Sequence, residues 1–405
     1  MTTIISQSSV GAGLRLSSGL DDADQVILAG VTVASTDAGA ISLRGSDTQL
    51  VVAGTVIADG VGIVLGGAVE DTGNVLRIGS GGMVLGATGA SLLGGVRFAN
   101  AGDVWGYDIG LRLSAGAATA QMSNTGSLGG GVGVQVSSLA EGAVRFVNRG
   151  TLEGDALAYR GGLGTDAVTN LGSVLGDVRL GGGADRWVGT GGSVDGTVYG
   201  EAGNDTFVPA DGDAVSGGDG FDTVDMRGSP TLVDLVLGDR MVEIERVLGS
   251  GRGDDITGDA AANTIQGLGG SDDLVGGAGA DVLTGGEGRD DLAGDQGNDR
   301  YVFRSQSDVA TGPDYIDGFG QVVGDDDTLV FVAAGFGAGL VAGQGLVESQ
   351  LQANGNPDAE TADVRFIYDG FTLRFDPDGS GAAGSIRIVD LDNSPTLTPL
   401  DFLIV

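Results

Sequence analysis

Residues 249–302 read GSGRGDDIT, GDAAANTIQ, GLGGSDDLV, GGAGADVLT, GGEGRDDLA and GDQGNDRYV, six units of nine residues in one unbroken register. The sixth position of each unit is an aspartate or its amide: Asp254, Asn263, Asp272, Asp281, Asp290 and Asp299. The eighth position is always apolar or aromatic: Ile256, Ile265, Leu274, Leu283, Leu292 and Tyr301. A glycine-rich turn followed by a short strand cannot bury its own apolar face, so the units must stack. The stretch therefore predicts a parallel β-solenoid.

The sixth-position carboxylates have two explanations. Asp favours turns by itself, and an acidic, solvated turn would account for one such unit. It does not account for six units in phase, each with an apolar residue two positions later. Calcium does, because this hard cation takes six to eight oxygen ligands from carboxylates and backbone carbonyls. Glycine lets those carbonyls converge without Cβ clashes.

The units resemble the calcium-binding nonapeptide GGxGxDxUx of the RTX family, in which U is a large apolar residue. Three units match it in full: Gly217–Asp225, Gly276–Thr284 and Gly285–Ala293. The resemblance implies that two nonapeptides form one coil of a β-roll, so that side chains 18 residues apart stack in two columns. One column would hold Asp254, Asp272 and Asp290, and the other Asn263, Asp281 and Asp299. Adjacent members would share an ion, and the neutral Asn263 would make the weakest site.

The predicted calcium ligands are these six residues together with the turn glycines Gly267, Gly269, Gly276, Gly277, Gly279, Gly285, Gly286 and Gly288. Asp205 and Asp222 are further candidates, but with Asp185 they lie out of nine-residue phase. We expect their sites to be partial or isolated. Asp376 and Asp378, in the loop DPDGSG, resemble the first half of an EF-hand loop without its Glu at the twelfth position. An acidic hairpin turn is the alternative there.

A different repeat runs through the first half of the chain. The pattern Asn-x-Gly-x-(Leu/Val)-x-Gly begins at Asn100, Asn124, Asn148 and Asn170, with short alternating segments such as VGVQV between copies. Such units predict β-strands stacked in coils of roughly 20–28 residues, a parallel β-helix. The recurring Asn predicts a ladder of side-chain hydrogen bonds, with a ligand-binding row as the alternative.

The fold class predicted is all-β, with three parts. Residues 1–197 form the β-helix, 198–302 the calcium-binding β-roll, and 303–405 a β-rich cap. Longer apolar runs at 328–332 and 364–368 indicate strands of that cap.

The amino-acid composition indicates which kinds of binding partner suit the chain. Of 405 residues, 80 are Gly and 41% are hydrophobic, which suits repeats with tight turns. The net charge is −35, and residues 201–405 hold 38 acids against 10 Arg. Cations are the natural partner of such a segment, and no basic cluster suggests nucleic acid. The sequence contains no run of 18 apolar residues, so it predicts no membrane-spanning helix.

The chain has no Cys and no His, and all 20 basic residues are Arg. A zinc protease of the HExxH type is therefore excluded. Carboxylates in the β-helix are sparse (Asp103, Asp108, Glu141, Glu153 and Asp155), and Tyr107 and Tyr159 lie near two of them. We expect a non-catalytic structural or adhesive protein of the cell surface, surface layer or extracellular matrix. The alternative is a calcium-dependent β-helix lyase or epimerase acting on acidic polysaccharide.

The chain ends indicate the export route. MTTIISQSSVGAG lacks the basic and apolar regions of a Sec signal. The tail DFLIV resembles the end of the uncleaved type I secretion signal of serralysin-like proteins. It also fits a final β-strand of the cap, and both can hold. The resemblance implies export by type I machinery and an extracellular or surface location. Self-association, with an open β-edge near Val26–Val33, and cell-surface polysaccharide are the partners considered.

Overall fold

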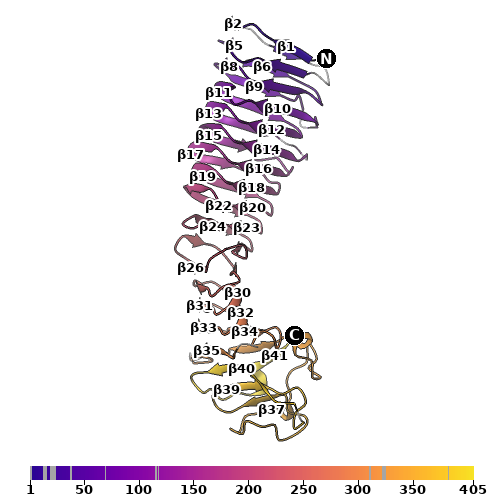
Figure 1. The fold of residues 1–405 in the computed structure, drawn as a ribbon, viewed down its shortest axis with the longest axis vertical. Coiled ribbons are helices and arrows are strands. Elements are labelled where there is room, and N and C mark those ends of the chain that lie inside the picture. The colour runs from indigo at the N-terminus through magenta and orange to yellow at the C-terminus, as the bar shows by residue number, and fades with distance from the viewer. Residues whose placement is uncertain are drawn as a thin grey trace. The chain divides into compact units, whose positions relative to one another are not determined.

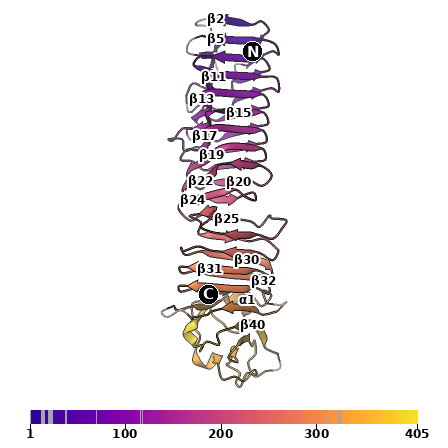
Figure 2. The ribbon, with the colours of Figure 1, turned by 90° about the vertical axis from the view of Figure 1, so that its left-hand side faces the viewer.

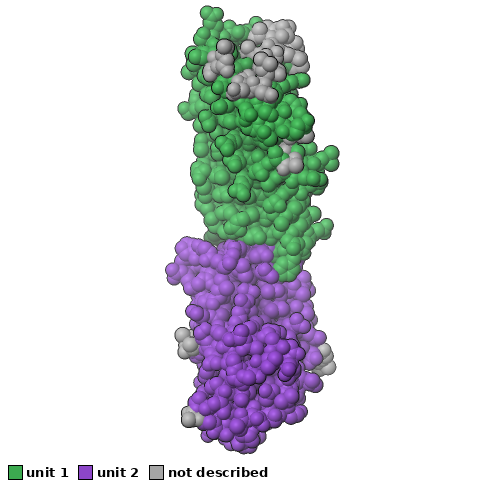
Figure 3. Space-filling model, turned by 90° about the vertical axis from the view of Figure 1, so that its right-hand side faces the viewer, with its two compact units in different colours: residues 1–222 green, residues 223–405 purple. Residues whose placement is uncertain are grey.

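The computed structural model describes residues 2–405 except for 12–15, 19–23, 37–38, 69, 115, 117, 310–311, 322–324 and 382. The chain forms two compact units, Met1–Asp222 and Thr223–Val405, coloured separately in Figure 3. Both are built almost wholly from parallel strands that stack coil upon coil. The predicted all-β parallel β-solenoid is confirmed. The finer division after residues 197 and 302 stays a prediction.

Two sheets run through unit 1, and each coil contributes a strand to both (Figure 1). The strands of the first sheet, all parallel to their neighbours, are β1 (Thr2–Ile5), β4 (Asp24–Ile27), β7 (Gln49–Val52), β10 (Asn74–Ile78), β12 (Val96–Asn100), β14 (Ala120–Asn124), β16 (Val144–Asn148), β18 (Asp166–Asn170), β20 (Arg186–Val188) and β23 (Thr206–Val208).

The strands of the second sheet of unit 1 vary more in length, from 3 to 12 residues, and several have a register shift near their middle. They are β2 (Ser9–Gly11), β3 (Leu16–Ser18), β5 (Thr32–Ser35), β6 (Gly39–Leu43), β8 (Thr55–Ala58), β9 (Val61–Leu65), β11 (Met83–Leu93), β13 (Asp103–Ser114), β15 (Ser127–Val136), β17 (Thr151–Arg160), β19 (Ser173–Gly182), β21 (Ser193–Asp195), β22 (Thr197–Ala202) and β24 (Ala214–Asp219).

Inward positions of these strands stack into continuous apolar files. Phe98, Met122 and Phe146 are Cα partners in successive coils, and the file continues through Val168, Trp187 and Phe207. All are buried. The core of a solenoid is therefore a set of files rather than a single cluster, which is why each coil needs its neighbours.

The predicted asparagine ladder is confirmed. Each Nδ2 donates to Oδ1 of the Asn in the next coil: Asn100 to Asn124 at 2.8 Å, Asn124 to Asn148 at 2.8 Å, and Asn148 to Asn170 at 2.9 Å. Each of these four amides also donates to the backbone carbonyl of the first residue of a strand in the next coil: Ser127, Thr151, Ser173 and Ser193. The donors of these buried amides are thus used within the ladder and in joining successive coils, which supports a structural role.

Unit 2 also has two sheets, whose strands Figure 2 shows in successive coils. The first contains β25 (Thr223–Asp225), β28 (Arg246–Leu248), β30 (Thr264–Gly270), β32 (Val282–Gly288), β34 (Arg300–Phe303), β36 (Thr328–Phe331) and β41 (Phe402–Ile404). The second contains β26 (Asp234–Val236), β29 (Asp255–Thr257), β31 (Asp273–Ala278), β33 (Asp291–Gln296), β35 (Asp314–Asp317), β40 (Ile386–Leu391), β39 (Thr372–Phe375), β38 (Phe366–Tyr368) and β37 (Leu351–Gln352).

The eighth residues of the nonapeptides form the core of this roll, as predicted. Ile256, Leu274 and Leu292 stack on one side, and Ile265, Leu283 and Tyr301 on the other, with at most 2% of each exposed. The files continue into Ile316 and Leu329, beyond the last nonapeptide.

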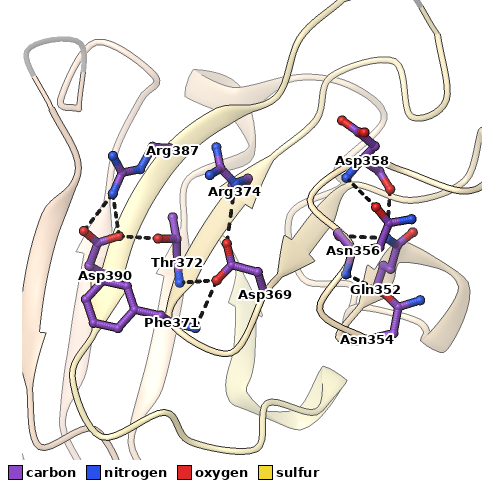
Figure 4. A network of polar contacts seen from close by, with 10 residues as sticks. All are labelled: Gln352, Asn354, Asn356, Asp358, Asp369, Phe371, Thr372, Arg374, Arg387 and Asp390. Carbon is purple, nitrogen blue, oxygen red and sulfur yellow. Dashed lines mark hydrogen bonds and ion pairs between the residues drawn. The ribbon is translucent and has the colours of Figure 1, made fainter.

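The C-terminal part of the second sheet is mixed, because β39 runs antiparallel to both β38 and β40. Unit 2 also contains the short strand β27 (Met241–Val242) and three short helices, α1 (Ala333–Phe336), η1 (Glu348–Gln350) and η2 (Pro399–Asp401). An aromatic cluster in this unit includes Phe331, Phe366, Phe375 and Phe402. A polar network joins β39 to β40 (Figure 4): Arg387 pairs with Asp390 at 2.9 Å, and Thr372 Oγ1 donates to Asp390.

Candidate metal centre

Residues 18 apart face one another throughout the nonapeptide block. Asp255 pairs with Asp273 and Asp273 with Asp291, while Thr264 pairs with Val282 in the other sheet. The two expected columns of sixth-position residues follow. The backbone N–H of Asp254 donates to Oδ1 of Asp272 at 2.8 Å, and that of Asp272 to Oδ1 of Asp290 at 3.0 Å. In the second column, Asn263 N–H donates to Asp281 at 2.7 Å, and Asp281 N–H to Asp299 at 2.9 Å.

Both columns extend past the last nonapeptide, which the sequence did not reveal. Asp290 N–H donates to Oδ1 of Asp314 at 3.1 Å, and Asp299 N–H donates to Oδ1 of Asp327 at 3.0 Å. The separations are 24 and 28 residues, so the nine-residue phase is lost. The remaining signal is the triplet Asp-x-apolar, Asp314 before Ile316 and Asp327 before Leu329. Both aspartates are buried.

A third ladder lies in unit 1. Asp166 N–H donates to Asp185 Oδ1, Asp185 N–H to Asp205, and Asp205 N–H to Asp222, each at 2.7 Å. These aspartates are therefore stacked in a ladder despite their broken phase, and the expectation that their calcium sites are partial or isolated stays a prediction. Coils of different length still align because the parallel strands hold the register and the spare residues enter loops. Asp166 is the last carboxylate of the row, because its partner in the preceding coil is Val144, whose N–H donates to Asp166 Oδ1 at 3.2 Å. Tyr159 donates to Oδ2 of Asp166 at 2.7 Å.

The second carboxylate oxygen decides what the columns can bind. Oδ2 of Asp272, Asp281, Asp290 and Asp299 is buried and has no hydrogen-bond partner among the described residues, and the same holds for Asp185 and Asp205. Burying an unpaired carboxylate oxygen is costly, and such groups call for an ion or a water.

Except for Asp185, whose turn begins with Leu180, each of these oxygens lies close to the first glycine of its own turn. A Cβ added at Gly276 would come within 2.5 Å of Asp281 Oδ2 and 2.9 Å of the Gly294 carbonyl oxygen of the next coil. Gly267 and Gly285 are placed in the same way beneath Asp272 and Asp290, as are Gly249 beneath Asp254 and Gly200 beneath Asp205. The absence of a Cβ thus lets a carboxylate oxygen, and at Gly276 also a carbonyl oxygen, come close to the turn. That donor set fits a hard cation such as calcium.

The other turn glycines serve the backbone. Gly277, Gly279 and Gly286 have φ of 103°, 117° and 114°, in the region that side chains disfavour. A Cβ at Gly288 would meet the carbonyl oxygen of Gly270 in the preceding coil. Gly269 has only ordinary contacts, the nearest at 3.6 Å, so nothing in the packing around it requires glycine.

Burial also governs the charge of the columns. It raises the pKa of Asp272 and Asp281 to about 7 and that of Asp299 to about 6, and neighbouring carboxylates add to the effect. Burial likewise raises the pKa of Asp314 and Asp185 to about 8. A bound cation would favour the charged form, so binding must displace protons near neutral pH.

The acidic loop of the cap differs from these turns. Asp376 is buried and its Oδ1 accepts the N–H of Asp378 at 3.1 Å, while the exposed Asp378 accepts the N–H of Ala383 through Oδ2 at 3.0 Å. Both carboxylates thus support their own loop, and calcium binding there stays a prediction. Nowhere in the described residues do three acidic side chains gather into a metal-binding cluster, so ions in the turns would depend on backbone carbonyls.

Comparison with known families agrees with this geometry. Two overlapping segments, residues 248–283 and 267–301, match the profile of the RTX calcium-binding nonapeptide repeat. Residues 248–301 are RTX calcium-binding repeats. The RTX turns therefore bind calcium, and the oxygens described above are their candidate ligands.

Among solved structures, the chain is similar to a subunit of the Azotobacter vinelandii mannuronan C5-epimerase. The two are 26% identical over 38% of this chain and 80% of that one, with a TM-score of 0.27. No curated protein matches the chain. Across the described residues, no helix has the length and apolar character needed to cross a membrane.

Proposed function

We propose that the protein is a secreted calcium-binding structural or adhesive component of the cell surface, surface layer or extracellular matrix, which folds on calcium after export. The observation that supports this is the set of buried, unpartnered Oδ2 atoms in the RTX turns. Without a cation these atoms oppose folding, and with one they stabilise it. RTX repeats are typical of secreted proteins, and external calcium near millimolar would fill sites with Kd of roughly 10⁻⁴–10⁻³ M.

Circular dichroism of the full chain during calcium titration tests the folding step. We expect much of the β-signal of unit 2 to appear only with calcium. An undiminished β-signal in excess chelator would contradict it. Imaging the protein on native cells, with and without chelation, tests surface attachment.

We also propose export by type I machinery through the C-terminal region. The tail forms β41 beside β36, with 4% of Phe402 and 2% of Ile404 exposed. A signal there is accessible only before the chain folds, which suits calcium-dependent folding outside the cell. Deleting about the last 60 residues should abolish export, whereas deleting residues 1–40 should not. Export that survives the C-terminal deletion would refute the route.

One observation favours the rival, a β-helix that binds or modifies polysaccharide. A hollow of about 300 Å³ on unit 1 is lined by Asp103, Val104, Trp105, Ser127, Leu128, Thr151 and Glu153. The indole of Trp105 is 39% exposed and lies against Gly129 of the next coil. An aromatic face beside carboxylates and hydroxyls suits a sugar ring. Cleavage or epimerisation of alginate or pectin, lost in Asp103→Asn or Glu153→Gln, would establish this function; we expect no turnover.

A further inference from the structure

One sheet of unit 1 has a basic outward face. Strands β10, β12, β16 and β20 each carry one exposed arginine: Arg77, Arg97, Arg145 and Arg186. From β7 to β23 the strands of this sheet contain one carboxylate, Asp166, which is buried. The face is therefore free of exposed acids although the chain has a net charge of −35.

Three of these arginines form a file along the coils. Arg97 pairs with Gln121, which pairs with Arg145, and the file continues through Ala167 to Arg186. With neighbouring strands about 4.8 Å apart, an arginine recurs roughly every 10 Å. The salt bridges among described residues involve other arginines: Arg179, Arg227, Arg374 and Arg387. The adjacent file holds small, half-buried side chains: Ala99, Ser123, Val147 and Thr169.

Unit 2 presents the opposite arrangement. Asp234, Asp255, Asp273 and Asp291 are partners in successive parallel strands and are all exposed. Like charges directly opposite one another destabilise a sheet, so this file gains from a cationic partner. These aspartates line a shallow hollow of about 320 Å³, in which Arg289 is the one basic lining residue. The adjacent file again consists of small side chains: Val236, Thr257, Val275 and Ala293.

We propose that the arginine face of unit 1 binds the aspartate face of unit 2 in a second copy of the chain. This inference builds on the proposed structural role and names its partner. Both files have the inter-strand spacing of a parallel sheet, so each arginine in the Arg97 file can meet a carboxylate without either surface adjusting. Guanidinium groups pair with carboxylates in a fixed, two-pronged geometry.

The small side chains beside each file allow the two sheets to approach closely. A pair joined by one such contact leaves an arginine face on one molecule and an aspartate face on the other, and assembly can then continue. A contact made by exposed ion pairs should be weak singly and strongly dependent on salt.

Sedimentation velocity of the full chain with calcium tests the proposal. We expect assembly at about 0.1 M NaCl and monomers at about 1 M, where the screening length falls to roughly 3 Å. Arg97→Glu/Arg145→Glu should weaken association by more than about tenfold. The control, Arg112→Glu/Arg160→Glu, makes the same charge change in an arginine file of the other sheet. The strands of that sheet also carry the exposed acids Asp103, Asp108 and Asp155, so the control should have little effect.

The reciprocal variant Asp255→Arg/Asp273→Arg should also be monomeric, and mixing it with Arg97→Glu/Arg145→Glu should restore association. Circular dichroism and calcium titration of each variant show whether it still folds, and Asp255→Asn/Asp273→Asn provides a milder version. Wild-type monomers at low salt would overturn the proposal. Assembly that the arginine variants leave unchanged would also overturn it, because that result is expected if calcium ions alone join the aspartate files of two molecules.

Binding of polygalacturonate through the arginine face of a monomeric protein would point to an external polyanion and also overturn it. Failure of the proposed structural function would appear differently, as turnover of polysaccharide or folding without calcium.

Discussion

The backbone N–H of Asp272 donates to Oδ1 of Asp290, 3.0 Å away and 18 residues later, while Oδ2 of Asp290 has no hydrogen-bond partner in the described structure. One oxygen of each carboxylate thus joins two coils, and the other borders the space above a glycine. Stacking and cation binding therefore use different atoms of the same side chain, which makes their contributions separable by mutation.

Asp281 should matter more than Asn263. Asp281→Ala removes the acceptor of the Asn263 N–H and a carboxylate from the middle of its column. Asn263→Ala removes no charge, although its amide accepts the Asp259 N–H and donates to the Ile244 carbonyl. A buried donor left unpaired costs about 1–3 kcal/mol of unfolding free energy. Asp281→Asn retains an acceptor and separates this loss from the loss of charge. Calcium titration followed by circular dichroism measures the folding midpoint, and equal shifts for Asp281→Ala and Asn263→Ala would argue against the shared column.

Asp327 should behave as a member of the column although it lies outside the RTX repeats. We expect Asp327→Ala to raise the calcium concentration needed for folding, because Asp299 N–H loses its acceptor and the last turn loses a carboxylate. Asp326→Ala is the matched control, since that side chain is exposed. If isothermal titration gave the same stoichiometry and affinity for both variants, Asp327 would be only a structural acceptor.

Two turn glycines from successive nonapeptides should differ sharply. Gly276→Ala places a methyl group against Asp281 Oδ2 and the Gly294 carbonyl, so it should lower stability in calcium by about 1–3 kcal/mol. Gly269→Ala meets nothing nearer than 3.6 Å and should be close to neutral. Thermal denaturation in calcium distinguishes them, and similar melting temperatures would be inconsistent with a ligand space above Gly276.

Leu268 occupies a position that suits glycine. Its φ is 83°, and the residues at the same position of the next two nonapeptides are glycines, Gly277 and Gly286. A side chain in this region costs roughly 1–2 kcal/mol, so Leu268→Gly should raise the melting temperature despite the entropy that glycine adds to the unfolded chain. Leu268→Ala keeps the unfavourable backbone and should not stabilise. A lower melting temperature for Leu268→Gly would show that its side chain contributes more than its backbone costs.

The calcium-free protein should lose stability as pH rises. The pKa of Asp272 and Asp281 is about 7 in the folded chain, above the usual value of about 4, so the protonated form stabilises the fold. This contribution is complete below about pH 4 and disappears as pH passes through about 7. Calcium should reverse the trend, because it binds the ionised form. Calorimetry from about pH 5 to 8 measures both curves, and a calcium-free melting temperature that increases over this range would refute the assignment.

The nonapeptide sequence was sufficient to predict the roll, because each turn repeats the same backbone requirement. Glycine at the first position, Asp281 at the sixth and Leu283 at the eighth recur every nine residues, and a strict period of that kind has one low-energy way to stack. The asparagine ladder followed for the same reason. Asp314, Asp327 and the row from Asp166 to Asp222 did not follow from the sequence, because insertions of variable length separate them.

Parallel strand pairing restores their alignment by placing the extra residues in loops, and only the folded coils show which aspartates meet. The arginine file from Arg97 to Arg186 was likewise undetectable in the sequence, where its members lie 48 and 41 residues apart. Sequence period determined what each turn looks like; strand register, set by long-range hydrogen bonds and core packing, decided which turns and which charges lie side by side.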